Sequence, residues 1–121
     1  MRILTYHTPE GVALGVKVDG GVLDVRAAAE ALGVDAVAAT PEALFARGLE
    51  ALPALEDLVG QASASQGKDG WLYDEASLTL GPSVSNPEKL LCVGLNNRQH
   101  APDPSSKEPP VPVPCSKFNR A

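Results

Sequence analysis

The sequence predicts an α+β fold: a small antiparallel β-meander with covering helices, followed by one further strand that opens a second domain. Three observations indicate this. Residues 12–18 alternate apolar with other side chains between two turn signals. Leucines recur at helical spacing over residues 49–61. Residues 89–95, KLLCVGL, are mostly apolar and follow the linker-like sequence GPSVSNP, which predicts a buried strand.

The meander is predicted from residues 2–6, 12–18 and 22–25. TPEG at positions 8–11 and DGG at positions 19–21 are turn sequences that separate these runs. Because neighbouring residues of a strand point to opposite faces, only one parity of residues 12–18 is expected to face the core. Helices should cover that face, so that Leu14, Val16 or their neighbours contact the helical leucines Leu52, Leu55 and Leu58.

Three helices are expected between the meander and residue 62. An alanine-rich run over residues 26–32 is stopped by Gly33. Residues 41–47 have Thr40 as a cap before a proline and end at a glycine. Residues 49–61 form the longest helix, with Pro53 in its first turn. Residues 63–70 are a predicted loop, and residues 71–73 and 77–80 are predicted short strands.

Composition divides the chain into an accessory domain over residues 1–81, a linker over residues 82–88 and a third part, residues 89–121, which is the start of a second domain. Residues 1–86 carry five basic and twelve acidic side chains, whereas the remainder carries five and three. Six prolines fall between positions 102 and 114, a density that excludes helix and central strand. That segment is predicted to be a polyproline-like loop with little packing.

Charge and the absence of special segments restrict the function classes. The net charge of −5 argues against a nucleic-acid or anionic-membrane partner. No apolar run approaches the ~18 residues of a membrane span, and the N-terminus lacks a signal-peptide core, so we expect a soluble cytoplasmic protein. Cys92 and Cys115 lie far apart without metal-ligand spacing, and we interpret them as one buried and one incidental thiol in a reducing compartment.

Two segments of the C-terminal part resemble a known family. KLLCVGLNNRQHA, from position 89, and CSKFN, from position 115, are similar to the opening of the catalytic domain in the fumarylacetoacetate hydrolase family. The usual pattern there is K-I-x-C-V-G-L-N-Y-x-x-H-A-x-E, then a proline-bearing loop and F-S-K-F-N. Residues 1–25 and the junction P-x-x-x-N-P-x-K resemble the accessory domain that precedes it in bacterial members.

The resemblance implies a metal-dependent enzyme of β-diketo or 2-oxo/2-hydroxy-dienoic acids, which hydrolyses, isomerises, hydrates or decarboxylates them. It implies a catalytic β-roll, of which residues 89–121 would be an incomplete opening, and a Mg²⁺ or Mn²⁺ cofactor. His100 matches the family's general base, Asp103 the position of its carboxylate partner, and Lys117 a lysine near the active site. Asn96 matches a substrate-side asparagine. Without the resemblance, a single histidine after a strand is a surface or capping residue.

Several positions depart from the family pattern. Asn97 stands where tyrosine is usual, Asp103 where glutamate is usual, and Pro114 and Cys115 where an apolar residue and phenylalanine are usual. The family's metal ligands, an E-x-E pair and a later aspartate, follow the second motif, and no E-x-E occurs in these 121 residues. We therefore assign no metal ligand and expect an N-terminal portion of such an enzyme that is inactive alone.

A second hypothesis comes from a different functional class. The chain would be a non-catalytic α+β interaction module that pairs with a partner, such as a full-length paralogue or a second copy, through its proline-rich C-terminal segment. DNA sequence beyond codon 121 would discriminate between the hypotheses, because the family's metal ligands should be encoded there.

Overall fold

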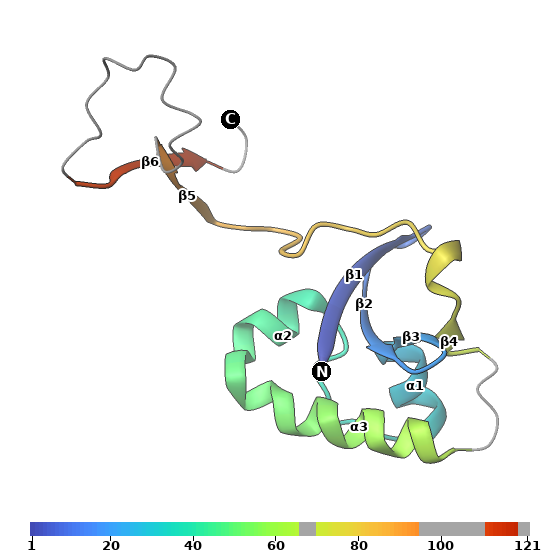
Figure 1. The fold of residues 1–121 in the computed structure, drawn as a ribbon. Helices are drawn as coiled ribbons and strands as arrows, with labels where there is room; N and C mark the ends of the chain where they lie inside the picture. Colours follow the sequence, from blue (N-terminus) through green and yellow to red (C-terminus); the bar gives the residue numbers. More distant parts are fainter. Residues whose placement is uncertain (66–69, 95–110, 119–121) are drawn as a thin grey trace. The chain divides into compact units, whose positions relative to one another are not determined.

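The protein consists of two compact units, residues 1–85 and 86–121, in a computed structural model that describes residues 1–65, 70–94 and 111–118 (Figure 1). The boundary falls inside the segment 82–88 that was expected to be a linker. Antiparallel strands and helices are both abundant, which confirms the predicted α+β class. No helix in these ranges is long and apolar enough to cross a membrane.

The first unit is built on a four-stranded antiparallel sheet with the order β1-β2-β3-β4. Its strands are β1 (Arg2–Thr8), β2 (Gly11–Val18), β3 (Gly21–Asp24) and β4 (Leu72–Tyr73). Ile3, Val16 and Leu23 are paired across the first three strands, so they share one face. The predicted meander and the short strand predicted at residues 71–73 are therefore confirmed.

The turn between β2 and β3 depends on glycine. Gly20 and Gly21 have φ angles of 96° and 151°, in the region that side-chain-bearing residues rarely adopt. A Cβ atom on Gly21 would lie 2.3 Å from the carbonyl oxygen of Tyr73 in β4. The DGG sequence thus makes both the tight turn and the close approach of β4 to the sheet.

The end of the first helix at Gly33 and the cap Thr40 of the second agree with the sequence, while the last of the three predicted helices extends to Ala64, beyond the predicted residue 61. The helices are α1 (Val25–Leu32), α2 (Pro41–Arg47), the 3₁₀ helix η1 (Gly48–Ala51), α3 (Leu52–Ala64) and the 3₁₀ helix η2 (Glu75–Ser77). Asp24 accepts a hydrogen bond from the Ala27 N–H, and Thr40 accepts one from the Ala43 N–H. The single helix predicted from residue 49 is divided in two, since the α-helical part starts only at Leu52, next to Pro53.

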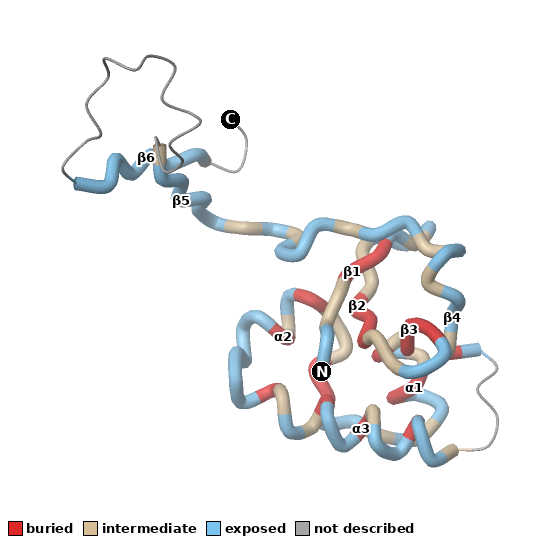
Figure 2. The backbone as a smooth tube through the Cα atoms, in the orientation of Figure 1, coloured by how far each residue is buried: buried red, intermediate tan, exposed pale blue. Residues whose placement is uncertain are grey.

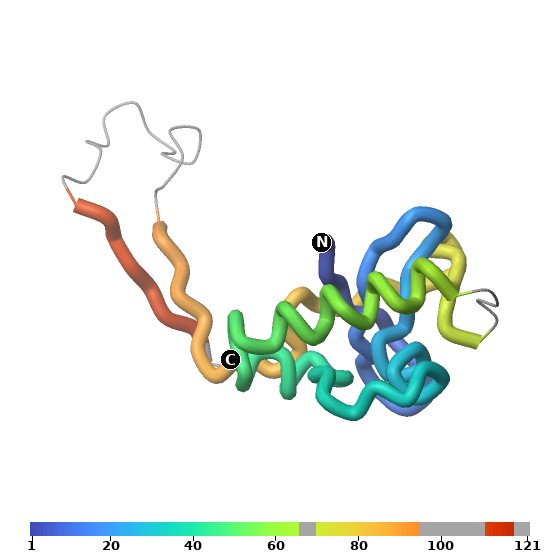
Figure 3. Tube along the Cα trace, turned by 90° about the horizontal axis from the view of Figure 1, so that it is seen from below, coloured from blue at the N-terminus to red at the C-terminus, as the bar shows by residue number. Residues whose placement is uncertain are grey.

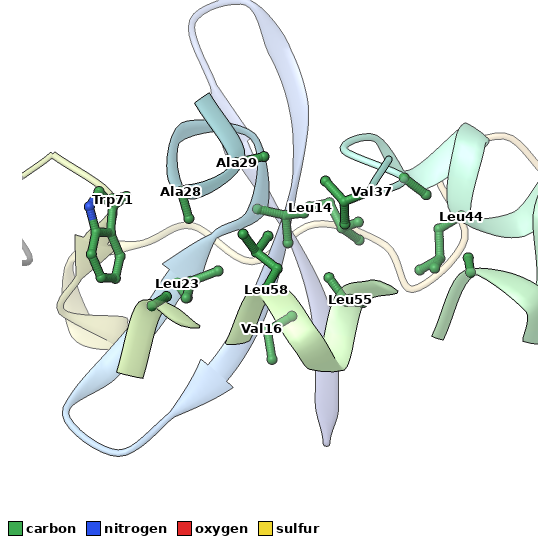
Figure 4. Packing of buried hydrophobic residues seen from close by; sticks show 14 residues of the cluster. Leu14, Val16, Leu23, Ala28, Ala29, Val37, Leu44, Leu55, Leu58 and Trp71 are labelled. Carbon is green, nitrogen blue, oxygen red and sulfur yellow. The ribbon is translucent and has the colours of Figure 1, made fainter. Parts of the chain in front are cut away.

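The core lies between the helices and one face of the sheet (Figures 2 and 3). Leu14 and Val16 of β2 are 2% and 1% exposed, and Leu55 and Leu58 of α3 are fully buried. Figure 4 shows these side chains gathered with residues of α1 and β3. The predicted contact between the even-numbered residues of β2 and the leucine stripe is confirmed, while Leu52 is only partly buried.

The opposite face of the sheet is also partly covered, although within residues 12–18 only even-numbered side chains join the core cluster, as expected. Tyr6 and Val22 lie on this second face and are 2% and 0% exposed. Gly15 lies beside them, and a Cβ atom there would be 2.7 Å from Val22 Cγ1. The Tyr6 ring also meets the Tyr73 ring edge-on, with centroids 6.3 Å apart. The missing side chain at Gly15 provides the space that these residues fill.

Residues 77–80 are not the strand that the sequence predicted. Their first residue ends η2, and Leu80 makes an isolated bridge with Tyr6. The chain follows β1 through two 2.8 Å hydrogen bonds, from the His7 N–H to the Thr79 carbonyl and from the Gly81 N–H to the Thr5 carbonyl. The period-two sequence SLTL at residues 77–80 indicated a strand, but the extent of its pairing depends on tertiary position, and only one bridge forms.

The second unit contains a hairpin of β5 (Lys89–Gly94) and β6 (Val113–Phe118). Two expectations are wrong here. Residues 89–94 do form a strand, but its side chains are largely exposed because a two-stranded ribbon cannot cover its own faces. Val113 and Pro114, at the end of the segment predicted as a polyproline-like loop, instead begin β6; a strand at the edge of a sheet tolerates Pro114, which lacks an N–H. Residues 102–110 of that segment lie outside the described residues.

Candidate functional site

The described parts of the two motifs that resemble the hydrolase family, residues 89–94 and 115–118, lie side by side in the β5–β6 hairpin. In the antiparallel register Leu91 pairs with Ser116 and Leu90 pairs with Lys117. The ladder runs without a break from Lys89 to Gly94 on β5. The structure thus joins two segments that are separated by eighteen residues of sequence, positions 95–112.

Lys117 is the one resemblance-assigned residue within the described part of the chain. It is exposed and lies opposite Leu90. The pair Gly94 and Val113 is at the other end of the ladder. Residues 95–112 connect the two strands at that end. Lys117 is four residues from Val113, about 13 Å along the strand at ~3.3 Å per residue. The lysine therefore lies toward the end of the hairpin away from that segment.

The other assigned residues, Asn96, His100 and Asp103, lie outside the described residues. Their role remains the one that the resemblance implies. What the structure adds is the position of the two strands that flank them in sequence, because Gly94 and Val113 are paired neighbours.

Cys92 and Cys115 are directly opposite each other across the hairpin. Both are exposed, and neither is in a disulfide, so the interpretation of one buried thiol is wrong. Sequence reasoning missed this pair because it predicted a loop between positions 102 and 114 and no strand around Cys115. The alternation V-P-V-P-C over residues 111–115 was the available signal, since period-two patterning indicates a strand and prolines are compatible with an edge.

The resemblance to the hydrolase family implies a divalent metal, which needs a group of ligand side chains around one point. Across residues 1–65, 70–94 and 111–118, no three His, Cys, Asp or Glu side chains are grouped so that they could hold a metal ion. Mg²⁺ and Mn²⁺ need several oxygen ligands around one point. These residues do not supply such a set, and we derive no metal-dependent step from them.

In the first unit the Asp24 carboxylate connects a strand to a helix through two hydrogen bonds. The Tyr6 hydroxyl donates a hydrogen bond to Asp24 Oδ2, and Asp24 Oδ1 accepts one from the Ala27 N–H at 2.9 Å. Burial first, and then the hydrogen bond to Asp24, raise the pKa of Tyr6 above its usual value. Asp24 thus ties β1 to the start of α1.

A shallow cavity of about 180 Å³ lies where β1, α2 and residues 80–83 meet. Its lining carries hydroxyl and aliphatic groups and no ionisable side chain: Ile3, Leu4, Thr5, Leu14, Leu44, Phe45, Leu80, Gly81 and Ser83. Thr5 is 4% exposed, and its hydroxyl donates to the Pro82 carbonyl at 2.6 Å. With no ionisable side chain in its lining, the cavity offers little for acid–base chemistry.

Comparison with known proteins gives no match, whether by family model, by curated protein or by solved structure.

Proposed function

We propose that this chain is the N-terminal portion of a fumarylacetoacetate hydrolase family enzyme, a metal-dependent hydrolase, isomerase or decarboxylase of β-diketo or 2-oxo/2-hydroxy-dienoic acids. The observation that supports this is the β5–β6 pairing, which joins the two motifs that resemble the family. The two strands flank residues 95–112 in sequence. Because the strands are paired, the two ends of that segment are held close together, which lowers the entropy cost of ordering it.

In this proposal the chain's own residues handle protons and substrate. His100 takes a proton from water or substrate as general base, and Asp103 orients it. Asn96 and Lys117 contact the oxo-acid, the lysine by charge. The divalent cation that the resemblance implies would be held by carboxylates outside the described residues and would supply positive charge next to the oxo-acid oxygens.

The exposure of the hairpin agrees with this proposal. Leu91 is 74% exposed, Val93 50% and Val113 45%. An apolar ribbon of this kind is stable when more strands or another layer cover it. In a complete catalytic β-roll, further strands of the same polypeptide would supply that cover.

The same exposed side chains support the second candidate function, a non-catalytic module that pairs with a full-length paralogue. In that case the partner's sheet would cover Leu91 and Val93. This candidate requires a stable complex between the 121-residue chain and the paralogue, and no catalytic role for His100.

The test compares the 121-residue chain with the same chain continued by a family catalytic domain. Turnover of oxaloacetate or an acylpyruvate is measured with added Mg²⁺ or Mn²⁺. We expect no turnover by the short chain and metal-dependent turnover by the continued one. His100→Ala should then lower kcat by ~10²–10⁴-fold, the usual contribution of a general base.

His7→Ala is the matched control, since His7 is the other histidine of the chain and is exposed on β1. It should leave kcat unchanged. Turnover by the short chain itself, or equal effects of the two histidine substitutions, would contradict the proposal. A tight complex of the short chain with a full-length paralogue, without activity in the continued chain, would favour the module.

A further inference from the structure

Cys92 and Cys115 have the geometry of a cross-strand thiol pair. Residues directly opposite in an antiparallel ladder have Cα atoms about 4.5–5.5 Å apart, within the ~4.4–6.8 Å that disulfides span. Their Cβ atoms are about 4.5–5.5 Å apart in such ladders, against ~3.5–4.5 Å in a disulfide. A bond between the sulfur atoms therefore needs the strands to approach by about an ångström at most.

The surroundings of the pair allow a reagent to reach it. Both cysteines are exposed. The next pair on the same face of the hairpin is Gly94 with Val113, and the absence of a side chain at the glycine leaves one flank open. On the other flank, Lys117 lies two residues from Cys115, on the same face of β6, and adds a positive charge to that face. The site thus combines two adjacent thiols, open access and positive charge.

We propose that Cys92 and Cys115 form a reversible redox site that exchanges with an anionic low-molecular-weight disulfide, such as glutathione disulfide. One cysteine thiolate attacks a sulfur of glutathione disulfide, which forms a protein–glutathione disulfide and releases one glutathione thiolate. The second cysteine then attacks the protein sulfur of that bond and releases the second glutathione. Two protein thiols lose two electrons and two protons, and glutathione disulfide becomes two glutathione thiols.

The bond closes the segment between Cys92 and Cys115 into a covalent loop. Because the bond is exposed and requires a small strand movement, it should be readily reducible. If the proposed function holds, the loop contains His100, so oxidation would restrict the segment that carries the general base. The thiol exchange itself depends only on the register of β5 and β6.

The test uses the whole 121-residue chain in glutathione buffers of graded redox ratio. Samples are quenched with acid, alkylated and weighed by mass spectrometry. We expect both thiols to disappear together with loss of two hydrogen atoms and no lasting glutathione adduct. Cys92→Ser and Cys115→Ser should each accumulate the mixed glutathione disulfide, because the resolving thiol is missing.

A displaced-thiol variant is the matched control. Cys115→Ser combined with Ser116→Cys keeps two cysteines but moves one to the opposite face of β6, where it pairs with Leu91. This variant should accumulate glutathione adducts and form little internal disulfide. Internal oxidation equal to that of the unaltered chain, or two lasting adducts on the unaltered chain, would overturn the proposal. Unchanged Trp71 fluorescence confirms that each variant keeps the first unit folded, since the single tryptophan is buried there.

Discussion

Asp24 is the residue on which three elements of the first unit depend. One carboxylate oxygen caps α1 through the Ala27 N–H, and the other accepts the Tyr6 hydroxyl of β1. The residue is itself the last of β3. A hydrogen bond to a charged group contributes about 1.5–3 kcal/mol, so this one side chain stabilises both the start of the first helix and its link to β1.

Tyr6→Phe should lower the free energy of unfolding by about 1.5–3 kcal/mol at pH 7, because the buried hydrogen bond to Asp24 is lost. The pKa of Tyr6 is raised on folding, so its contribution is complete below the unfolded pKa of about 10 and is lost as pH rises above it. Urea unfolding followed by Trp71 fluorescence at pH 7 to 11 measures both effects.

Tyr73→Phe is the control for this prediction, because Tyr73 is 37% exposed and donates to the Gly70 carbonyl at 3.2 Å. The Tyr73→Phe variant should lose as much free energy of unfolding above pH 10 as the unaltered chain, whereas the Tyr6→Phe variant should lose less. Parallel pH curves for the unaltered chain and Tyr6→Phe would show that Tyr6 is not the group responsible.

Among the elements, the β2–β3 turn and α3 respond to alanine in opposite ways. Gly21→Ala should destabilise the first unit by more than about 1 kcal/mol, since its Cβ would meet the Tyr73 carbonyl. Gly60→Ala should stabilise it by about 0.5–1 kcal/mol, because Gly60 is exposed within α3 and has open space around it. Urea midpoints at pH 7 give both values.

Gly20→Ala separates backbone strain from collision in this experiment. Gly20 also has a positive φ, but no atom lies within 4 Å of its Cβ position. The prediction fails if Gly21→Ala is no more destabilising than Gly20→Ala. A Gly60→Ala variant that unfolds at lower urea than the unaltered chain would contradict the second half.

The elements that the sequence predicted correctly are those with local signals. Thr40 before Pro41, and the alternation over residues 12–18 before DGG, describe their structure within a few residues of chain. The pairing of β5 with β6 has no local signal, because register across a long connection depends on tertiary contacts. For the same reason the sequence indicated Lys117 by motif but could not place Cys115 opposite Cys92.

For the whole molecule, stability is expected to come from residues 1–85. The buried hydrophobic cluster lies entirely within this range, from Leu14 to Trp71. The described strands of the second unit bury few side chains and should add little to the free energy of unfolding. Residues 1–85 expressed alone should therefore unfold cooperatively at the same urea midpoint as the 121-residue chain.

Trp71 fluorescence and circular dichroism should give coincident transitions in both polypeptides if this is correct. A lower midpoint for residues 1–85 would mean that the second unit stabilises the first. Leu58→Ala, which removes a fully buried side chain, should lower the free energy of unfolding by about 2–5 kcal/mol in both polypeptides. The two urea midpoints should therefore fall equally.

The path of residues 79–81 beside β1 also bears on how this protein avoids aggregation. An uncovered strand edge is a template for cross-β growth, and charges, coverage or short length counter that risk. On the β1 edge of the sheet, Thr79 and Gly81 form hydrogen bonds with the backbone of His7 and Thr5, and the strand begins with the charged Arg2. The opposite edge of the sheet is β4, which is only two residues long. In the described part of the chain, the uncovered strand edges are then those of the hairpin. On β6, Pro114 lacks an N–H and Lys117 carries a charge, and both disfavour the addition of a strand from another molecule.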